Sequence, residues 1–422
     1  MTGLSFFVLS VISVLFGIIL FFDRRLSIIS FFIFLVLLPS SNLFKPILSI
    51  SGVMYYDFYF FILALHFFIS TIVKKKINKS SIISIVSLCS FVSFYCLISL
   101  YKGVILDKYL FRDLRPFLTL IYGMLLLDFL TKNFLYLKHN LLGINDMLRI
   151  LIIAFFSHIL IFLFLLYFAP YVTTDIYYNQ QIYRYIDAKS YIAALFIIST
   201  LSFNMKMINA KRILVVSSLF LACIVLLISN SRTLLGITVL LVLLTSNFKF
   251  YKKIIFTFLL GGCFFLYIRY FEISRILSLD LLASFATRYG PAISKIHEMS
   301  IFEVFFGYGF RTFFEIPWFG YRDLDPYLNS VDSLYLTFFV KYGIFSIVLI
   351  SLFFRIITAN IQNKRYRRLI ILFFLLLFIT YSTLYQNYSI IYIFYLILFS
   401  LSTFNFKINI NNKNGIGKIL RS

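Results

Sequence analysis

The sequence has few charged residues for its length, and acidic ones are especially scarce. Only 13% of its 422 residues are charged, and 16 Asp or Glu stand against 39 Lys or Arg. Hydrophobic residues make up 61% of the chain, which is more apolar surface than a water-soluble protein of this length can bury. This composition excludes a soluble globular protein and indicates a membrane protein.

Cysteine and the common catalytic signatures are scarce too. All four cysteines lie inside apolar runs, so we expect neither disulfides nor a metal site. The sequence contains no phosphate-binding glycine loop, no HExxH and no GxSxG. Asp323 and Asp325 resemble the acidic pair of metal-dependent sugar transferases, but a solvated turn before Pro326 is the better interpretation. We therefore expect no metal and no cofactor.

Long apolar runs recur from one end of the sequence to the other. A run of about 20 apolar residues is long enough to cross a bilayer as a helix. We therefore expect an all-α, polytopic transmembrane bundle of about 12–13 spans, forming a single integral membrane domain over residues 1–422. The predicted spans lie near 4–22, 26–42, 54–73, 80–101, 115–131, 150–169, 190–205, 212–230, 233–248, 254–271, 334–354, 369–385 and 388–405.

The basic residues occur in short clusters on alternate loops between these runs. This distribution is typical of cytoplasmic membrane loops and argues against a nucleic-acid partner, despite the net charge of +23. It predicts an amino terminus outside and a carboxy terminus inside. Except for Asp23, Asp128 and Asp146, nearly all acidic residues then fall on the outer side, although they were not used to assign it.

Four polar segments are predicted on the outer side, at residues 102–115, 170–190, 229–233 and 272–333. The last is the one long extracytoplasmic loop, and we expect the chemistry at this face. Arginines cluster near the span ends there, and a guanidinium offers a planar fork of donors that matches pyrophosphate oxygens. The alternative is that each one simply reaches the lipid headgroups. The arginines are Arg112, Arg115, Arg184, Arg232 and Arg288.

Two further ionisable residues flank or enter the predicted span at 334–354. Asp332 could accept a proton from an attacking sugar hydroxyl, or it could cap the helix that begins there. Lys341 lies within the span, where an ionisable residue is a functional candidate unless it reaches the interface. The Gly307 and Gly309 turn and the single tryptophan, Trp318, offer a tight bend and a flat face for a sugar ring.

Several stretches resemble motifs of the O-antigen polymerase and ligase family of bacterial glycan transferases. SNSRTLLG at 229–236 resembles the Ser-Arg motif that opens the family's conserved region. Arg288, FFGYGF at 305–310 and VDSLYLTFFVKYGIFS at 331–346 then follow in the family's order: an Arg, a G-x-G turn, and a polar residue before an apolar helix. YRYIDAKSY at 183–191 resembles the family's outer loop. Together these matches cover about the last two-thirds of the chain.

The resemblance implies inverting glycan transfer without nucleotide or metal, on sugars carried by undecaprenyl pyrophosphate at the periplasmic face of the bacterial inner membrane. It implies catalytic roles for Asp332, Arg232 and Arg288. Ligases of the family have His at the position of Asp332 and a second glycine at the position of Ser346. These two differences favour a polymerase. We also expect several residues of the predicted outer face to contact the pyrophosphate or the glycan: Arg184, Arg112, Arg115, Asp187, Tyr308, Arg311 and Trp318.

The expected partners are the lipid-linked oligosaccharide, membrane lipid and a chain-length regulator protein. Three other functions compete with a polymerase: a ligase that moves finished polysaccharide, a flippase or other transporter, and a non-catalytic scaffold. A transporter should carry charges in mid-span and often shows repeat symmetry, which is not apparent here. A scaffold would not need an arginine confined to the short turn at 229–233.

Overall fold

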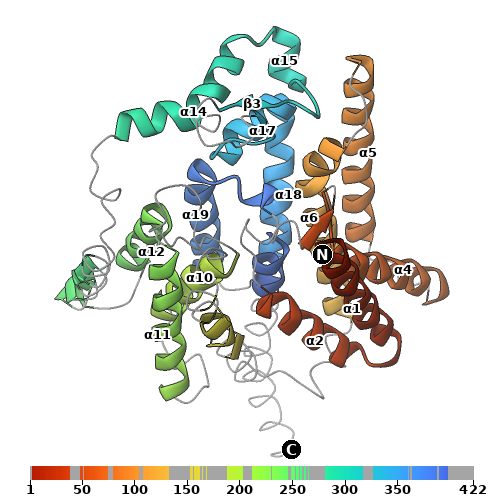
Figure 1. The fold of residues 1–422 in the computed structure, drawn as a ribbon. Helices are drawn as coiled ribbons and strands as arrows, with labels where there is room; N and C mark the ends of the chain where they lie inside the picture. The colour runs from red at the N-terminus through yellow and green to blue at the C-terminus, as the bar shows by residue number, and fades with distance from the viewer. Residues whose placement is uncertain are drawn as a thin grey trace, which may run out of the picture.

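The computed structural model is almost entirely helical, with two short antiparallel hairpins (Figure 1). It describes residues 2–38, 48–50, 52–74, 79–103, 108–132, 188–202, 212–229, 231–245, 281–316, 327–359, 361, 364–386 and 389–397, with scattered residues between 153 and 168 and between 249 and 265. Arg184, Asp187 and Trp318 of the predicted site, and the Asp323 and Asp325 pair, lie outside the described residues.

The amino-terminal part is a group of three packed helices. Helices α1 (Thr2–Phe22), α2 (Arg24–Leu37) and α4 (Asp57–Lys74) pack with α1 against both others. The junction of α1 and α2 is closed by Asp23, whose carboxylate accepts the Leu26 N–H at 3.1 Å in the manner of a helix cap. A hairpin of β1 (Ser49–Ile50) and β2 (Val53–Met54) precedes α4.

The central and carboxy-terminal helices pack around these. Helix α6 (Lys108–Lys132) contacts α4, α5 (Lys79–Tyr101) and α18 (Ser346–Thr358). Helix α10 (Ala188–Ser202) packs on α11 (Arg212–Ile228) and α12 (Arg232–Thr245). Helix α12 also contacts α19 (Lys364–Thr380). A 3₁₀ turn, η5 (Thr383–Tyr385), reaches α6, and residues 389–397 are helical.

Four of the described helical stretches are long and apolar enough to cross a membrane: Gly3–Phe22, Ile82–Tyr101, Leu110–Thr131 and Leu334–Thr358. Five shorter apolar helices accompany them. Large hydrophobic side chains lie exposed along their outer surfaces, for example Phe7 and Phe61, as expected of helices that face lipid. The helical character expected from the sequence is therefore confirmed, and these helices are compatible with the expected multi-pass membrane protein. The total of 12–13 spans stays a prediction, since the runs at 150–169 and 254–271 fall largely outside the described residues.

The predicted span at 334–354 consists of two helices rather than one. Helix α17 (Leu334–Tyr342) ends at Gly343, whose φ is 56°, and the 3₁₀ turn η4 (Gly343–Phe345) leads into α18. A Cβ at Gly343 would stand 2.4 Å from the Phe305 carbonyl oxygen. Only glycine therefore fits at the break, whose place the apolar composition alone does not reveal.

The long predicted loop at 272–333 is largely built from defined elements. It contains α14 (Leu281–His297), α15 (Ile301–Phe306) and a hairpin of β3 (Phe314–Glu315) with β4 (Tyr327–Leu328). Helices α14 and α15 lie over α17 at one end of the molecule (Figure 1). A small apolar cluster of Ala292, Phe314, Val331 and Val340 joins α14, β3 and α17. The segment is therefore docked on the helices as a cap.

Candidate functional site

The turn from Gly307 to Thr312, here called the G-x-G loop, is held by the bundle through its backbone. Four consecutive N–H groups each donate to an acceptor from another element: Tyr308 to the Val340 carbonyl at 2.9 Å, Gly309 to the Lys341 carbonyl at 2.9 Å, Phe310 to Ser99 Oγ at 3.0 Å and Arg311 to Asp113 Oδ2 at 2.5 Å. The acceptors come from α17, α5 and α6. Such complete pairing of buried donors fixes the loop in one conformation.

Glycine is required at the first position of this loop. Gly307 has a φ of 71°, and a Cβ there would stand 2.2 Å from the Lys341 carbonyl. Arg311 is the one non-glycine residue with a positive φ among the residues described, at 61°. A side chain held in the left-handed region costs about 1–3 kcal/mol and persists only where its surroundings impose it. Arg311 is therefore held in place by its backbone contacts, which is typical of functional positions.

The loop rests on a buried ion pair that the sequence did not reveal. Lys341 Nζ lies 2.5 Å from Asp113 Oδ1, and the two side chains are 0% and 1% exposed. Asn329 Nδ2 donates to the same oxygen at 3.4 Å, and Lys341 Nζ lies 5.1 Å from the Tyr385 ring centre. The sequence predicted that Lys341 is functional or reaches the interface, but not that it pairs with Asp113. The sequence pattern places Asp113 in a polar outer segment, yet it lies inside α6.

A second group of residues lies where α14 meets the start of α17. Arg288 Nη1 lies 3.4 Å from Asp332 Oδ2, and both side chains are accessible, at 33% and 52%. Next to Arg288, burial raises the pKa of Tyr289, and the charge of Asp332 raises it further. The Tyr289 phenol therefore stays protonated at neutral pH and can donate a hydrogen bond. Of the predicted residues, the structure thus joins Arg288 and Asp332 directly.

Arg232 approaches the same region from α12. Ser231 Oγ accepts the Leu234 N–H at 3.2 Å, so this serine caps α12, and its hydroxyl also bonds the hydroxyl of Tyr381. Tyr381 in turn interacts electrostatically with Tyr289. Arg232 follows the capping serine and is exposed. The Ser-Arg motif therefore places its arginine at the end of α12 that adjoins the Arg288–Asp332 pair.

Asp332 is not the helix cap that the sequence favoured. Helix α17 is capped by Ser333, whose Oγ accepts the Leu336 N–H at 3.4 Å. The Ser333 hydroxyl also donates to the Phe378 carbonyl. The capping oxygen comes from the residue directly before the helix, which is Ser333 and not Asp332. Hydrophobic periodicity does not locate the start of a helix to one residue. The carboxylate of Asp332 instead pairs with Arg288.

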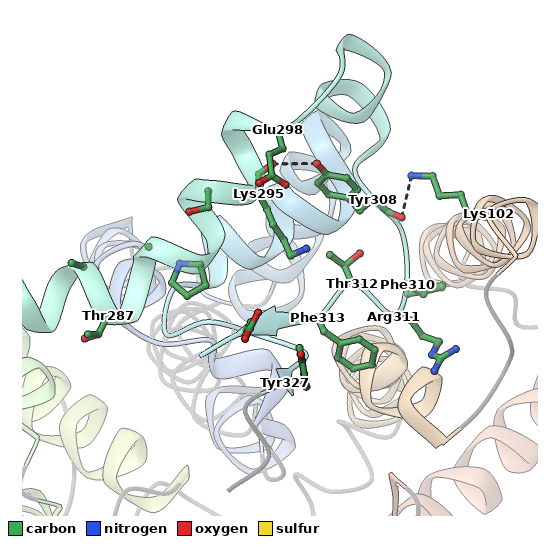
Figure 2. Close-up of a pocket in the computed structure, with 15 residues that line it drawn as sticks. Lys102, Thr287, Lys295, Glu298, Tyr308, Phe310, Arg311, Thr312, Phe313 and Tyr327 are labelled. Carbon is green, nitrogen blue, oxygen red and sulfur yellow. Dashed lines mark hydrogen bonds between the residues drawn. The ribbon is translucent and has the colours of Figure 1, made fainter. Parts of the chain in front are cut away.

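A cavity of about 1070 Å³ opens between α14, the G-x-G loop and the β3–β4 hairpin (Figure 2). Tyr308 lies at its wall, where its ring centre is 5.4 Å from Lys102 Nζ and 5.7 Å from Lys295 Nζ. The Tyr308 hydroxyl donates to the Lys295 carbonyl at 3.2 Å, and burial raises the pKa of this phenol. Arg311 also lines the cavity. Two residues predicted from the sequence thus share this wall.

Lys102, beside this cavity, is tied to α15. Its Nζ lies 3.6 Å from Glu303, whose carboxylate also accepts hydrogen bonds from the Ser300 backbone and hydroxyl. Partial burial raises the pKa of Glu303, but these hydrogen bonds and the Lys102 charge outweigh it, so the pKa is lowered overall. Glu303 is therefore ionised at neutral pH and anchors the rim of the cavity.

Arg115 does not join these groups. Arg115 is 4% exposed and donates to both carboxylate oxygens of Asp57, at 2.8 and 2.9 Å, and to the Gly52 carbonyl. Tyr122 donates to the same carboxylate at 3.0 Å. These bonds link α6 to α4 and occupy the donors that a pyrophosphate would need. Arg112 is half-buried near the start of α6.

Within the described ranges, no three His, Cys, Asp or Glu side chains converge as a metal site would require. The chain belongs to a family of unknown function, DUF6369, whose model matches residues 130–408. That region contains Arg232, Arg288, Asp332 and Lys341. No curated protein and no solved structure matches the chain.

Proposed function

We propose that this protein is a glycosyltransferase that polymerises lipid-linked oligosaccharide repeat units. The product is O-antigen or capsular polysaccharide, made at the periplasmic face of the inner membrane from undecaprenyl-pyrophosphate-linked units. The observation that supports this most directly is the accessible Arg288–Asp332 pair, at 3.4 Å, between α14 and the start of α17. Arg232 begins α12 next to the Ser231 contact with Tyr381, at the same end.

The pair supplies the two groups that such a transfer needs. Arg288 and Arg232 hold the pyrophosphate of the donor lipid through guanidinium forks. Asp332 takes the proton from the acceptor hydroxyl. The hydroxyl oxygen then forms a bond to the anomeric carbon, the bond from that carbon to the phosphate oxygen breaks, and the lipid pyrophosphate leaves. Attack from the face opposite the leaving group inverts the anomeric centre, and the step needs no metal or cofactor.

A polymerase accounts for an acidic residue at position 332 better than a ligase does. The resembling family's ligases have His where this chain has Asp332, so transfer onto another lipid-linked repeat unit is favoured over transfer of a finished chain. The partners of the reaction are then the lipid-linked oligosaccharide, the surrounding membrane lipid and a regulator of chain length.

A repeat-unit flippase is the second candidate, and one observation favours it. Lys189 of α10 is 0% exposed and lies 3.0 Å from His158 Nδ1, while Lys341 is buried against Asp113. Charged groups inside a membrane bundle are typical of transport pathways. The accessible Arg288–Asp332 pair is not needed by a flippase, so the polymerase remains the first proposal.

The test is a gel of surface glycan from a deletion strain complemented with variants. We expect the deletion, Arg288→Ala and Asp332→Asn each to leave lipid bearing one repeat unit, with the wild-type ladder lost and the variant proteins still in the membrane. Arg367→Ala is the matched control, since Arg367 is exposed on the basic first turn of α19. Unchanged ladders in both site variants would refute the proposal. Loss of all added sugar would identify a ligase, and cytoplasmic accumulation of the lipid-linked unit a flippase.

A further inference from the structure

The cavity beside α14 is separate from the Arg288–Asp332 pair, and the transfer chemistry above does not use it. We propose that this cavity binds the acceptor oligosaccharide, so that the glycan accepting the new bond is recognised by α14 and the G-x-G loop. The inference rests on the proposed function and assigns the acceptor side of the same reaction.

The lining of the cavity suits a sugar chain better than a phosphate group. The lining includes three cationic side chains, Lys102, Lys295 and Arg311, and two carboxylates, Glu298 and Glu315. The net charge of the lining is therefore +1. A phosphate site would gather donors without carboxylates. Sugar hydroxyls both donate and accept, so they can bond the carboxylates and the cations together.

Aromatic side chains complete the lining. Tyr308, Phe313 and Tyr327 line the cavity with aromatic rings, a side-chain type that can cover the apolar face of a sugar ring, and they come from the G-x-G loop, from the residue before β3 and from β4. Small-molecule sites measure roughly 300–1,000 Å³, and this cavity, at about 1070 Å³, lies at or above the top of that range. The size therefore favours a chain of several sugars over a single one.

The recognition groups are fixed before any ligand arrives. Tyr308 is held by its own N–H, by its hydroxyl bond to the Lys295 carbonyl and by two neighbouring ammonium groups. Arg311 is held in its left-handed conformation by the bond from its N–H to the buried Asp113. Figure 2 shows the Lys295 side chain extending from α14 toward the space that these residues enclose. Because these side chains are already ordered, ligand binding costs little conformational entropy.

Helix α14 connects this cavity to the reacting group. Thr287 and Gly290 line the cavity, while Arg288 between them pairs with Asp332. An oligosaccharide that lies along α14 therefore brings its terminal hydroxyl toward the carboxylate that accepts the proton. Binding and chemistry are thus carried by neighbouring residues of one helix.

The experiment measures binding to the full-length protein in lipid nanodiscs. The probe is a fluorescently labelled oligosaccharide of two repeat units, released from the host strain's surface glycan by partial acid hydrolysis. We expect Lys295→Gln and Tyr308→Ala to weaken its binding by about tenfold or more, as the loss of a charge-assisted or stacking contact implies. Tyr308→Phe keeps the ring and should bind within about threefold of wild type. Lys364→Gln, a remote exposed lysine of α19, is the control.

The outcomes separate this proposal from the proposed function. Normal probe binding by Arg288→Ala, which the ladder gel expects to be inactive, would support a distinct acceptor site. Wild-type affinity in both Lys295→Gln and Tyr308→Ala would overturn the site, whatever the gel shows. Failure of the wild-type protein to bind the probe, or equal binding of labelled maltotetraose, would overturn it too. Neither of these results would bear on the loss of ladders in Arg288→Ala.

Discussion

Lys341 and Asp113 form an ion pair of 2.5 Å between α17 and α6, although 228 residues separate them in sequence. Neither side chain is accessible to solvent. The lysine carbonyl and the aspartate carboxylate each accept one N–H of the G-x-G loop. One pair therefore joins two helices and supports the wall of the proposed acceptor site.

Removing one partner of this pair should destabilise the protein strongly. Asp113→Asn or Lys341→Met leaves the other charge buried without compensation, which costs about 3–5 kcal/mol. The double variant removes both charges and should recover much of that loss. Thermal unfolding of the purified protein in detergent measures the comparison. Losses in the double variant equal to the sum of the single ones would show that the two side chains do not interact.

The close contact at Gly307 predicts a severe effect of one methyl group. Gly307→Ala places a Cβ 2.2 Å from the Lys341 carbonyl at a φ of 71°, so the loop must move away from α17. We expect a loss of about 1–3 kcal/mol and loss of oligosaccharide binding. Gly236→Ala in α12 is the control: nothing lies within 4 Å, and alanine favours a helix by about 0.5–1 kcal/mol. Equal melting temperatures for the two variants would contradict the close contact between the loop and α17.

Arg115 should be needed for folding, unlike an exposed arginine such as Arg367. Arg115→Ala leaves the partly buried Asp57 carboxylate beside Tyr122 without its ion-pair partner, so we expect a marked loss of folded protein in the membrane. Arg115→Lys should recover only part of it, because an ammonium cannot reproduce two parallel bonds to one carboxylate. Arg367→Ala, at an exposed position of α19, should keep wild-type levels. Fluorescence-detected size-exclusion chromatography gives the readout, and normal levels of Arg115→Ala would refute a structural role.

The start of α17 separates a capping residue from a reacting one. Ser333→Ala removes the cap and should lower stability by about 1 kcal/mol. Asp332→Ala, with an exposed carboxylate, should change the melting temperature little but abolish the glycan ladder. Melting curves and surface-glycan gels of the two variants give the test. A loss of stability in Asp332→Ala as large as in Ser333→Ala would show that Asp332 also caps α17.

Much of this architecture follows from local properties of the chain. The lack of charge and the length of the apolar runs predicted a helical protein, which the structure confirms, with helices long and apolar enough to cross a membrane. The same pattern predicted that Arg232, Arg288 and Asp332 lie near span ends: Arg232 and Asp332 do lie at helix starts, whereas Arg288 lies inside α14. Arg288 and Asp332 form an ion pair, and Arg232 begins α12 at a serine that bonds Tyr381.

Only the tertiary structure decided which of these residues act together. Asp113 pairs with Lys341, Arg115 with Asp57 and the G-x-G loop with the backbone of α17, each across a long stretch of sequence. Such pairings depend on how helices pack, and neither periodicity nor charge pattern specifies a distant partner. Local sequence determined the helices and the polar segments between them, whereas packing decided that Arg115 joins α6 to α4 while Arg288 pairs with Asp332 at an accessible face.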